Sequence, residues 1–245
     1  MTAAGEAVPA AAPGARLLEL VAVMDRLRSP GGCPWDAEQT HASLAPYALE
    51  EAFEVVEAIE SGSPDHLREE LGDLLLQVVF HARVAEEAPE GERFDVDDVA
   101  AGIVAKLVHR HPHVFGDPDE GAADDALSAA DVEAGWEARK RLEKGRASAM
   151  DGVPAALPAL ARAAKLLGRA RRAGLDVDAL VPGGTSGAAA PGQARDAEAE
   201  LGDRLLAVVA DAARETPDVD PETALRAAVR RLEQRARDAE AAGPA

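Results

Sequence analysis

Five acidic residues in one short stretch of the sequence have the types and the spacing of metal ligands. Glu50, Glu51 and Glu54 lie in one helix-like pattern, and Glu70 and Asp73 lie in the next. Residues three or four apart share one face of a helix, so each pattern presents one carboxylate pair: Glu51 with Glu54, and Glu70 with Asp73. If the two helices pack antiparallel, the pairs converge. Four carboxylates around one point favour a hard divalent cation such as Mg²⁺.

Two helices joined by a short turn would position these carboxylates. Residues 61–64 (Ser-Gly-Ser-Pro) interrupt the helical pattern, and Ser63 and Pro64 suit the N-cap and first position of the next helix. The apolar residues of that second helix lie beside its acids. Gly72 lies in mid-helix, where glycine costs about 1 kcal/mol against alanine. It indicates either close approach of a backbone or ligand, or simple helix packing.

The whole stretch is strongly acidic. Between residues 50 and 73 there are nine acidic side chains and one basic side chain, Arg68. Like charges one turn apart, such as Glu50 and Glu54, destabilise a helix by about 0.2–0.5 kcal/mol, which a bound cation would offset. An acidic helix face that meets only water is the alternative interpretation. Spacing alone leaves the two interpretations at about even weight.

Three motifs, in this order, resemble the MazG family. Gly-Cys-Pro-Trp-Asp at 32–36 comes first, then the two acidic patterns Glu-Glu-x-x-Glu at 50–54 and Glu-x-x-Asp at 70–73. Lys-Leu-Val-His-Arg-His-Pro-His-Val-Phe at 106–115 follows. The resemblance extends roughly over residues 16–240. It implies an all-α fold, a helical bundle of two tandem helical modules that dimerises through the bundle.

The resemblance also implies an activity and roles for individual residues. The activity is hydrolysis of nucleoside triphosphates, including deoxynucleotides, to monophosphate and pyrophosphate, with broad base specificity and a role in cleansing the nucleotide pool. The cofactor is Mg²⁺, with Mn²⁺ as an alternative, and its ligands are Glu51, Glu54, Glu70 and Asp73. Glu50 would orient or deprotonate the attacking water, or bind a further metal. The candidate contacts to phosphate, base or sugar are Trp35, Tyr47, Lys106, His109, Arg110 and Trp136.

The end of the fourth predicted helix carries a concentrated positive patch. Lys106 and Arg110 are one turn apart and could hold phosphates, with His109, His111 and His113 beside them. Cations near a helix C-terminus are also favoured by the helix dipole, which is the structural alternative. A zinc site at these histidines is a much weaker hypothesis, because no cysteine lies nearby.

Composition narrows the class of protein. The chain has 245 residues, of which 47% are hydrophobic and 3% aromatic, so alanine, leucine and valine fill the core and favour helices. A net charge of −19 argues against binding nucleic acid through its phosphates. The single cysteine, Cys33, fits a reducing cytoplasm. No apolar run is long enough to span a membrane.

The predicted helices divide the chain into modules. Helices are expected at 15–28, 38–60, 64–87, 95–110, 128–145, 159–173, 194–214 and 221–241, with a mobile acidic loop at 116–127. We expect a disordered tail at 1–14 that is not a signal peptide, a catalytic module at 15–145, a connecting helix within 146–181, a flexible linker at 182–193 and a second module at 194–245.

The second module contains a decayed copy of the first. Glu-Leu-Gly-Asp at 70–73 recurs at 200–203, and the two valines at 78–79 recur at 208–209. No Glu-Glu-x-x-Glu precedes the copy, and the residues before it are a Gly/Ala/Pro-rich segment. Arg230, Arg231 and Arg235 only partly restore the basic patch. We therefore expect a degenerate, structural repeat that holds metal poorly.

Two other classes of function remain open from the sequence. A di-iron carboxylate bundle needs paired Glu-x-x-His motifs, and this chain has one, Glu38-x-x-His41. A non-catalytic helical adaptor could use the acidic hairpin to bind a partner. Visible absorbance tests the first, and the effect of Glu51→Gln on hydrolysis tests the second.

Overall fold

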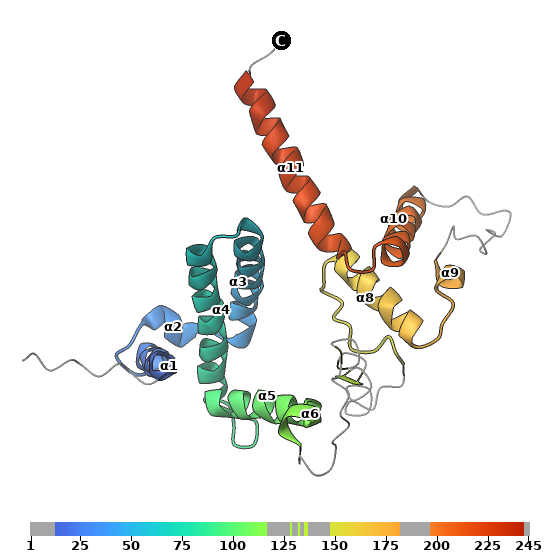
Figure 1. Ribbon diagram of the computed structural model, residues 1–245. Coiled ribbons are helices and arrows are strands. Elements are labelled where there is room, and N and C mark those ends of the chain that lie inside the picture. The colour runs from blue at the N-terminus through green and yellow to red at the C-terminus, as the bar shows by residue number, and fades with distance from the viewer. Residues whose placement is uncertain are drawn as a thin grey trace, which may run out of the picture. The chain divides into compact units, whose positions relative to one another are not determined.

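The computed structural model describes residues 13–116, 128, 132, 135, 136, 148–181 and 197–242. These residues form ten helices and no strand, which confirms the predicted all-α fold (Figure 1). The predicted tail, most of the acidic loop, the linker and most of the helix expected at 128–145 lie outside them. The chain divides into two compact units, 1–126 and 127–245, and each is described by itself.

In the part of the first unit that the structure describes, residues 13–116, there are six helices. They are α1 (Ala15–Arg28), α2 (Pro34–Glu38), α3 (His41–Ser61), α4 (Pro64–Ala85), α5 (Val96–Arg110) and α6 (Pro112–Phe115). The sequence pattern predicted a single helix at 38–60, whereas the chain forms the short α2 and then the longer α3. Thr40 separates them, because its side chain accepts a hydrogen bond from the Ser43 backbone and caps α3.

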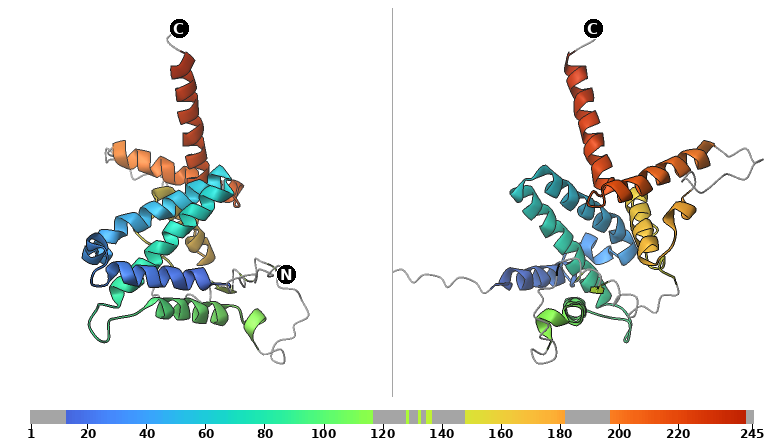
Figure 2. Two further views of the ribbon diagram at one scale, coloured as in Figure 1. Left: turned by 90° about the vertical axis from the view of Figure 1, so that its left-hand side faces the viewer. Right: turned by 45° about the vertical axis from the view of Figure 1, so that its right-hand side comes forward.

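The helices α3 and α4 form a tight antiparallel hairpin, and they run side by side in each view (Figures 1 and 2). Gly62 ends α3 in a left-handed conformation, with φ at 72°, which glycine adopts without strain. Ser63 then caps α4 and Pro64 occupies its first position, as the sequence predicts. The turn therefore reverses the chain with only two residues, Gly62 and Ser63, between α3 and α4.

The centre of the first unit is the C-terminal half of α4, against which α1, α3 and α5 pack. The fully buried side chains there are Met24, Leu44, Val79 and Phe80. Arg28 fixes the end of α1 to this core, because its Nε and Nη2 donate to the two carboxylate oxygens of Glu87 at 2.8 and 2.9 Å. These contacts connect the end of α1 to the chain just after α4.

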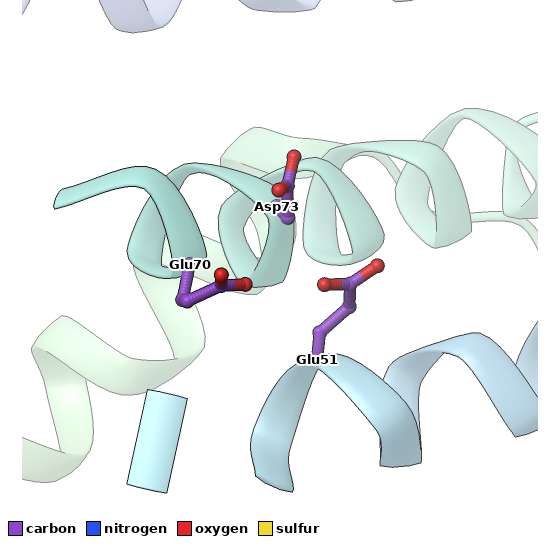
Figure 3. Close-up of side chains that lie close together, drawn as sticks. All are labelled: Glu51, Glu70 and Asp73. Carbon is purple, nitrogen blue, oxygen red and sulfur yellow. The ribbon is translucent and has the colours of Figure 1, made fainter. Parts of the chain in front are cut away.

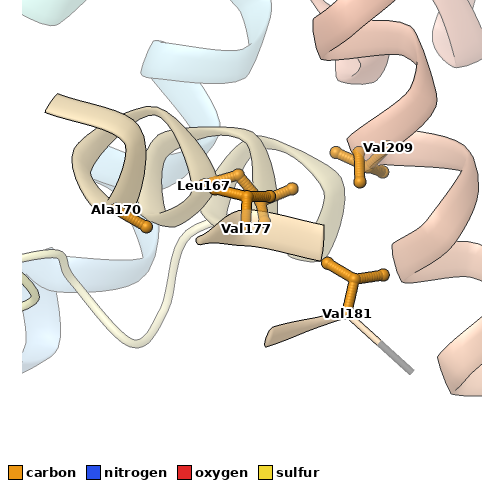
Figure 4. Close-up of a cluster of buried hydrophobic side chains, with 6 residues drawn as sticks. Leu167, Ala170, Val177, Val181 and Val209 are labelled. Atoms are coloured by element: carbon orange, nitrogen blue, oxygen red, sulfur yellow. The ribbon is translucent and has the colours of Figure 1, made fainter. Parts of the chain in front are cut away.

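The second unit is built on α8 (Ala159–Arg172), against which α9 (Val177–Leu180), α10 (Ala197–Glu215) and α11 (Pro221–Ala242) pack. Its core combines apolar side chains of α8, α9 and α10 with Val181 (Figure 4). The segment that the sequence predicts as a connection, 146–181, thus contributes α8 and α9 to this core. Among the helices that the structure describes, none is long and apolar enough to cross a membrane.

Candidate metal and nucleotide site

Three of the predicted metal ligands converge between α3 and α4. Glu51 extends from α3 toward Glu70 and Asp73 on α4 (Figure 3). Each of the three offers an oxygen atom within 4.8 Å of the other two. Within the described part of the chain, this is the one group of three acidic, histidine or cysteine side chains that is close enough to hold a metal ion. The antiparallel hairpin therefore brings both halves of the acidic motif to one place.

The electrostatics of the group favour a cation. Burial raises the pKa of the Glu51 carboxyl, and the nearby charges of Asp73, Glu54 and Glu70 raise it further. Like charges that crowd a partly buried carboxylate disfavour its ionised form, and a divalent cation would reverse this. The available donors are all carboxylate oxygens, which suit the oxygen-seeking ions Mg²⁺ and Mn²⁺. The residues present therefore fit the predicted metal.

Glu70 is the most buried of the three, with 9% of its surface exposed. His66, one turn earlier on α4, places its Nε2 atom 3.0 Å from the Glu70 Oε1 atom. This contact fixes the orientation of the Glu70 carboxylate. His66 was not among the predicted site residues, although its spacing of four residues from Glu70 places both on one helix face. Asp73 is exposed and faces solvent at the mouth of the group.

The other two predicted site acids of α3, Glu50 and Glu54, are not part of this group of three. Glu54 is half-buried and hydrogen-bonds with Glu51, and this bond also raises the Glu51 pKa. Glu54 therefore lies beside the group without belonging to the tight set of three. Glu50 is exposed, and it is not among the three converging side chains.

An aromatic cluster lies one helical turn from Glu51. Trp35 of α2 makes edge-to-face contacts with Tyr47 of α3 and Phe80 of α4, at centroid distances of 6.2 and 6.4 Å. Trp35 is 51% exposed and Tyr47 is 41% exposed. Because Tyr47 and Glu51 are four residues apart, they share one face of α3. The two predicted aromatic contacts thus lie together on the side of the carboxylates.

The predicted basic residues lie farther away. Lys106, His109 and Arg110 are at the end of α5, which crosses α4 near the C-terminal end of α4 (Figure 1). At 1.5 Å per residue, that end is about 18 Å along the helix from Asp73. Within one chain, the structure does not bring these cations to the carboxylates. Trp136 is half-buried and belongs to the second unit.

Gly72, between Glu70 and Asp73, does not mark a close approach within the chain. A Cβ atom added there would meet no atom within 4 Å beyond its own helix. Its exposed neighbours Leu71 and Leu75 continue this open surface along α4. The space beside the glycine is therefore free for a ligand or for another chain.

Comparison with known proteins places these residues in a family. A model of the MazG nucleotide pyrophosphohydrolase domain matches residues 39–115, which include α3, α4 and α5. The chain is 39% identical over 225 residues to the nucleoside triphosphate pyrophosphohydrolase/pyrophosphatase MazG of Thermotoga maritima, covering 89% of this chain and 82% of that protein. The chain belongs to the MazG family.

Three other relatives match different shares of the chain. An uncharacterized 26.1 kDa protein of Streptomyces cacaoi is 51% identical over 217 residues, 88% of this chain and 79% of its own length. The nucleoside triphosphate pyrophosphohydrolase of Escherichia coli K12 is 49% identical over 167 residues, 66% of this chain. That match spans 60% of the length of the E. coli protein. The match to the Mycolicibacterium smegmatis protein of the same name spans 52% of the length of that protein.

Proposed function

We propose that this MazG-family chain hydrolyses nucleoside triphosphates and deoxynucleoside triphosphates to the monophosphate and pyrophosphate. The observation that carries the proposal is the convergence of Glu51, Glu70 and Asp73 between α3 and α4. The names of the E. coli and T. maritima relatives support the same reaction. Broad base specificity, a role in cleansing the nucleotide pool and a cytoplasmic location are parts of this proposal.

The carboxylates would hold the metal cofactor, Mg²⁺ or Mn²⁺. Glu51, Glu70 and Asp73 supply the oxygen donors, and Glu54 stands beside Glu51 as a further ligand. When bound, such an ion polarises the α-phosphate and lowers the pKa of a water molecule. His66 keeps the Glu70 carboxylate oriented toward the group. We assign to Glu50, exposed on α3, the role of orienting or deprotonating the attacking water, or of binding a further metal.

The remaining predicted residues would bind the nucleotide. Trp35 and Tyr47 present exposed aromatic surface beside the carboxylates, which suits stacking against a base or sugar. Aromatic stacking tolerates every base, and this supports broad specificity. Lys106, His109 and Arg110 would neutralise phosphate charge. Since α5 leaves them distant from the carboxylates of their own chain, we assign them to the site of a second copy.

A homodimer is therefore part of the proposal. None of the residues of α5 is buried, although it carries five large apolar side chains that are more than a third exposed: Val99, Ile103, Val104, Leu107 and Val108. On α4, Leu71, Leu75 and Val78 are likewise exposed. An apolar surface of this extent on helices of one bundle is typical of an interface. A second copy that covers it would complete the bundle.

The reaction can be tested through its products. Full-length protein is incubated with Mg²⁺ and a panel of triphosphates in oxygen-18 water, and the products are separated by anion exchange. Monophosphate that carries the label, with unlabelled pyrophosphate, is expected, because attack at the α-phosphorus leaves the water oxygen on the monophosphate. Diphosphate and labelled phosphate would contradict the proposal. Binding of triphosphate without any product would favour the adaptor hypothesis.

A further inference from the structure

Two histidines of the first unit face each other outside the carboxylate group. His41 is the first residue of α3, and His81 lies in the last two turns of α4. Their Nδ1 atoms are 2.8 Å apart. The rings are parallel to within 2°, and their centres are 5.1 Å apart. The distance between the ring centres exceeds the distance between the two Nδ1 atoms by about two ring radii. The imidazoles therefore lie edge to edge, with the two Nδ1 atoms directed at each other.

This arrangement holds two imidazole nitrogens ready for one shared cation. In the metal-free pair, one Nδ1–H donates a hydrogen bond to the other Nδ1. Burial lowers the pKa of His81, and the charge of His41 lowers it further, which favours the neutral imidazole. A neutral imidazole is the form that ligates a metal. When both rings carry their proton at Nε2, both Nδ1 lone pairs are directed at the point between them.

We propose that His41 and His81 form a second metal site, which takes a borderline transition-metal ion such as Zn²⁺ or Ni²⁺ rather than Mg²⁺. Imidazole nitrogen suits these ions, whereas Mg²⁺ prefers oxygen. With metal–nitrogen bonds of about 2.0–2.1 Å in tetrahedral geometry, the nitrogens would stand about 3.3 Å apart. From the observed distance, the nitrogens must separate by about half an ångström, and each ring must turn by about 35° so that the two lone pairs converge at the tetrahedral angle. His41 is exposed and can make most of this movement.

The number of protons released when the metal binds depends on the protonation state of the two histidines. From the neutral pair, the donor ring moves its proton from Nδ1 to Nε2 through solvent, and no proton is released. From the singly protonated pair, one proton is released to solvent as the metal binds. Two histidines supply two ligands, and water completes the coordination. The affinity should therefore be lower than that of structural zinc sites, which have four protein ligands.

The site is separate from the carboxylates but acts on the same two helices. His41 precedes Glu51 by ten residues and His81 follows Asp73 by eight, which is about 15 and 12 Å along the helices. A bound ion would link the first residue of α3 to α4. Phe80, next to His81, contacts Trp35. The site would thus stiffen the hairpin at the end where the aromatic cluster lies, and Trp35 would report its occupancy.

The test is a titration of untagged full-length protein with NiCl₂ in an excess of Mg²⁺, followed by tryptophan fluorescence and by melting temperature. Wild-type protein should show saturable quenching and a raised melting temperature. His41→Gln and His81→Gln should each weaken the Ni²⁺ affinity at least tenfold. Glu51→Gln and His113→Gln are matched controls that should keep it, because they alter the carboxylates and the other histidine cluster.

Three results would overturn the proposal. These are Ni²⁺ affinity equal to that of the wild type in both histidine variants, loss of affinity in Glu51→Gln, and loss of affinity in His113→Gln. Circular dichroism checks that each variant is folded. His41 is exposed, so His41→Gln decides the question if His81→Gln does not fold. Quenching without any rise in melting temperature would also count against a site that links α3 to α4.

Discussion

The helices α4 and α10 carry the same motif in different surroundings. Both contain Glu-Leu-Gly-Asp, at 70–73 and 200–203, and both bury the positions nine and ten residues after the glutamate. In α4 these are Val79 and Phe80, and in α10 they are Val209 and Ala210, each at most 3% exposed. The positions of Leu71, Leu75 and Val78 are exposed in both helices. The repeat is therefore preserved as a helix with one core-facing side.

The two helices differ on the side where α3 packs. Glu70 is buried against α3, but Glu200 is exposed. Leu74, half-buried in α4, corresponds to an exposed Arg204 in α10. Among the described residues, α10 packs against α8, and no carboxylate of another helix joins Glu200 and Asp203 in a group of three. The Glu-x-x-Asp motif therefore forms a site only when a second acidic helix faces it.

The largest expected effect on hydrolysis comes from substitution of Glu51, which has no counterpart in the second unit. Glu51→Gln should lower kcat/KM for triphosphate hydrolysis by about a hundredfold or more, since it removes a metal ligand from the converging group. Steady-state kinetics in saturating Mg²⁺ measures this. Glu57→Gln, an exposed acid two turns along the same helix, is the control and should leave the rate unchanged.

Removal of Mg²⁺ should lower the melting temperature through the carboxylates of the first unit and not through those of the second. With Mg²⁺ at about 100 times its dissociation constant, the melting transition of wild-type protein should rise by roughly 5–10 °C, because the ion binds only the folded state. The rise should persist in an Asp203→Asn variant and disappear in Asp73→Asn. Scanning calorimetry with and without chelator provides the comparison. An equal rise in both variants would mean that Mg²⁺ binds elsewhere.

The exposed apolar surfaces of the two helices should also behave differently. Leu75→Arg on α4 should convert the dimer to a monomer, because it places a charge within the proposed interface. Leu205→Arg on α10 should leave the dimer intact, since the neighbouring Arg204 already exposes a charge there. Light scattering coupled to gel filtration gives both masses. A monomeric wild-type protein with full activity would remove the dimer from the proposal.

A smaller effect concerns pH. The pKa of Glu51 is raised, so its protonated form is favoured in the metal-free fold, and Mg²⁺ affinity should fall as the pH falls through this raised pKa. Glu54→Gln removes one charge and one hydrogen bond that raise it, so the midpoint should move to lower pH. Calorimetric Mg²⁺ titrations across pH measure this. If the pH midpoint of Mg²⁺ affinity were the same in Glu54→Gln and wild type, Glu54 would not act on the carboxylate group.

The acidic group was predictable because its determinants are local. The spacing of Glu70 and Asp73 fixes their shared face, and the turn at 61–64 forces the hairpin that brings Glu51 opposite them. The pairing of His41 with His81 was not predictable in this way. They are 40 residues apart, and their contact depends on the register in which α3 packs along α4. That register is set by buried side chains such as Leu44 and Val79.

The position of the basic residues and the contact between the ends of α1 and α4 could not be predicted from the sequence either. Arg28 and Glu87 are 59 residues apart, and no periodicity relates them. The place of Lys106 and Arg110 depends on where α5 crosses α4, which follows from the length of the loop between those helices. Helical periodicity thus determined which residues share a face, and tertiary packing determined which faces meet.

The most direct test of the account is the hydrolysis rate of Glu70→Gln beside that of Glu200→Gln. The two substitutions make the same chemical change at equivalent positions of the repeated motif. Glu70→Gln should lower the rate of monophosphate and pyrophosphate formation by about a hundredfold or more, while Glu200→Gln should retain the wild-type rate. Equal losses, or a loss in Glu200→Gln alone, would contradict the assignment of the active site to the α3–α4 hairpin.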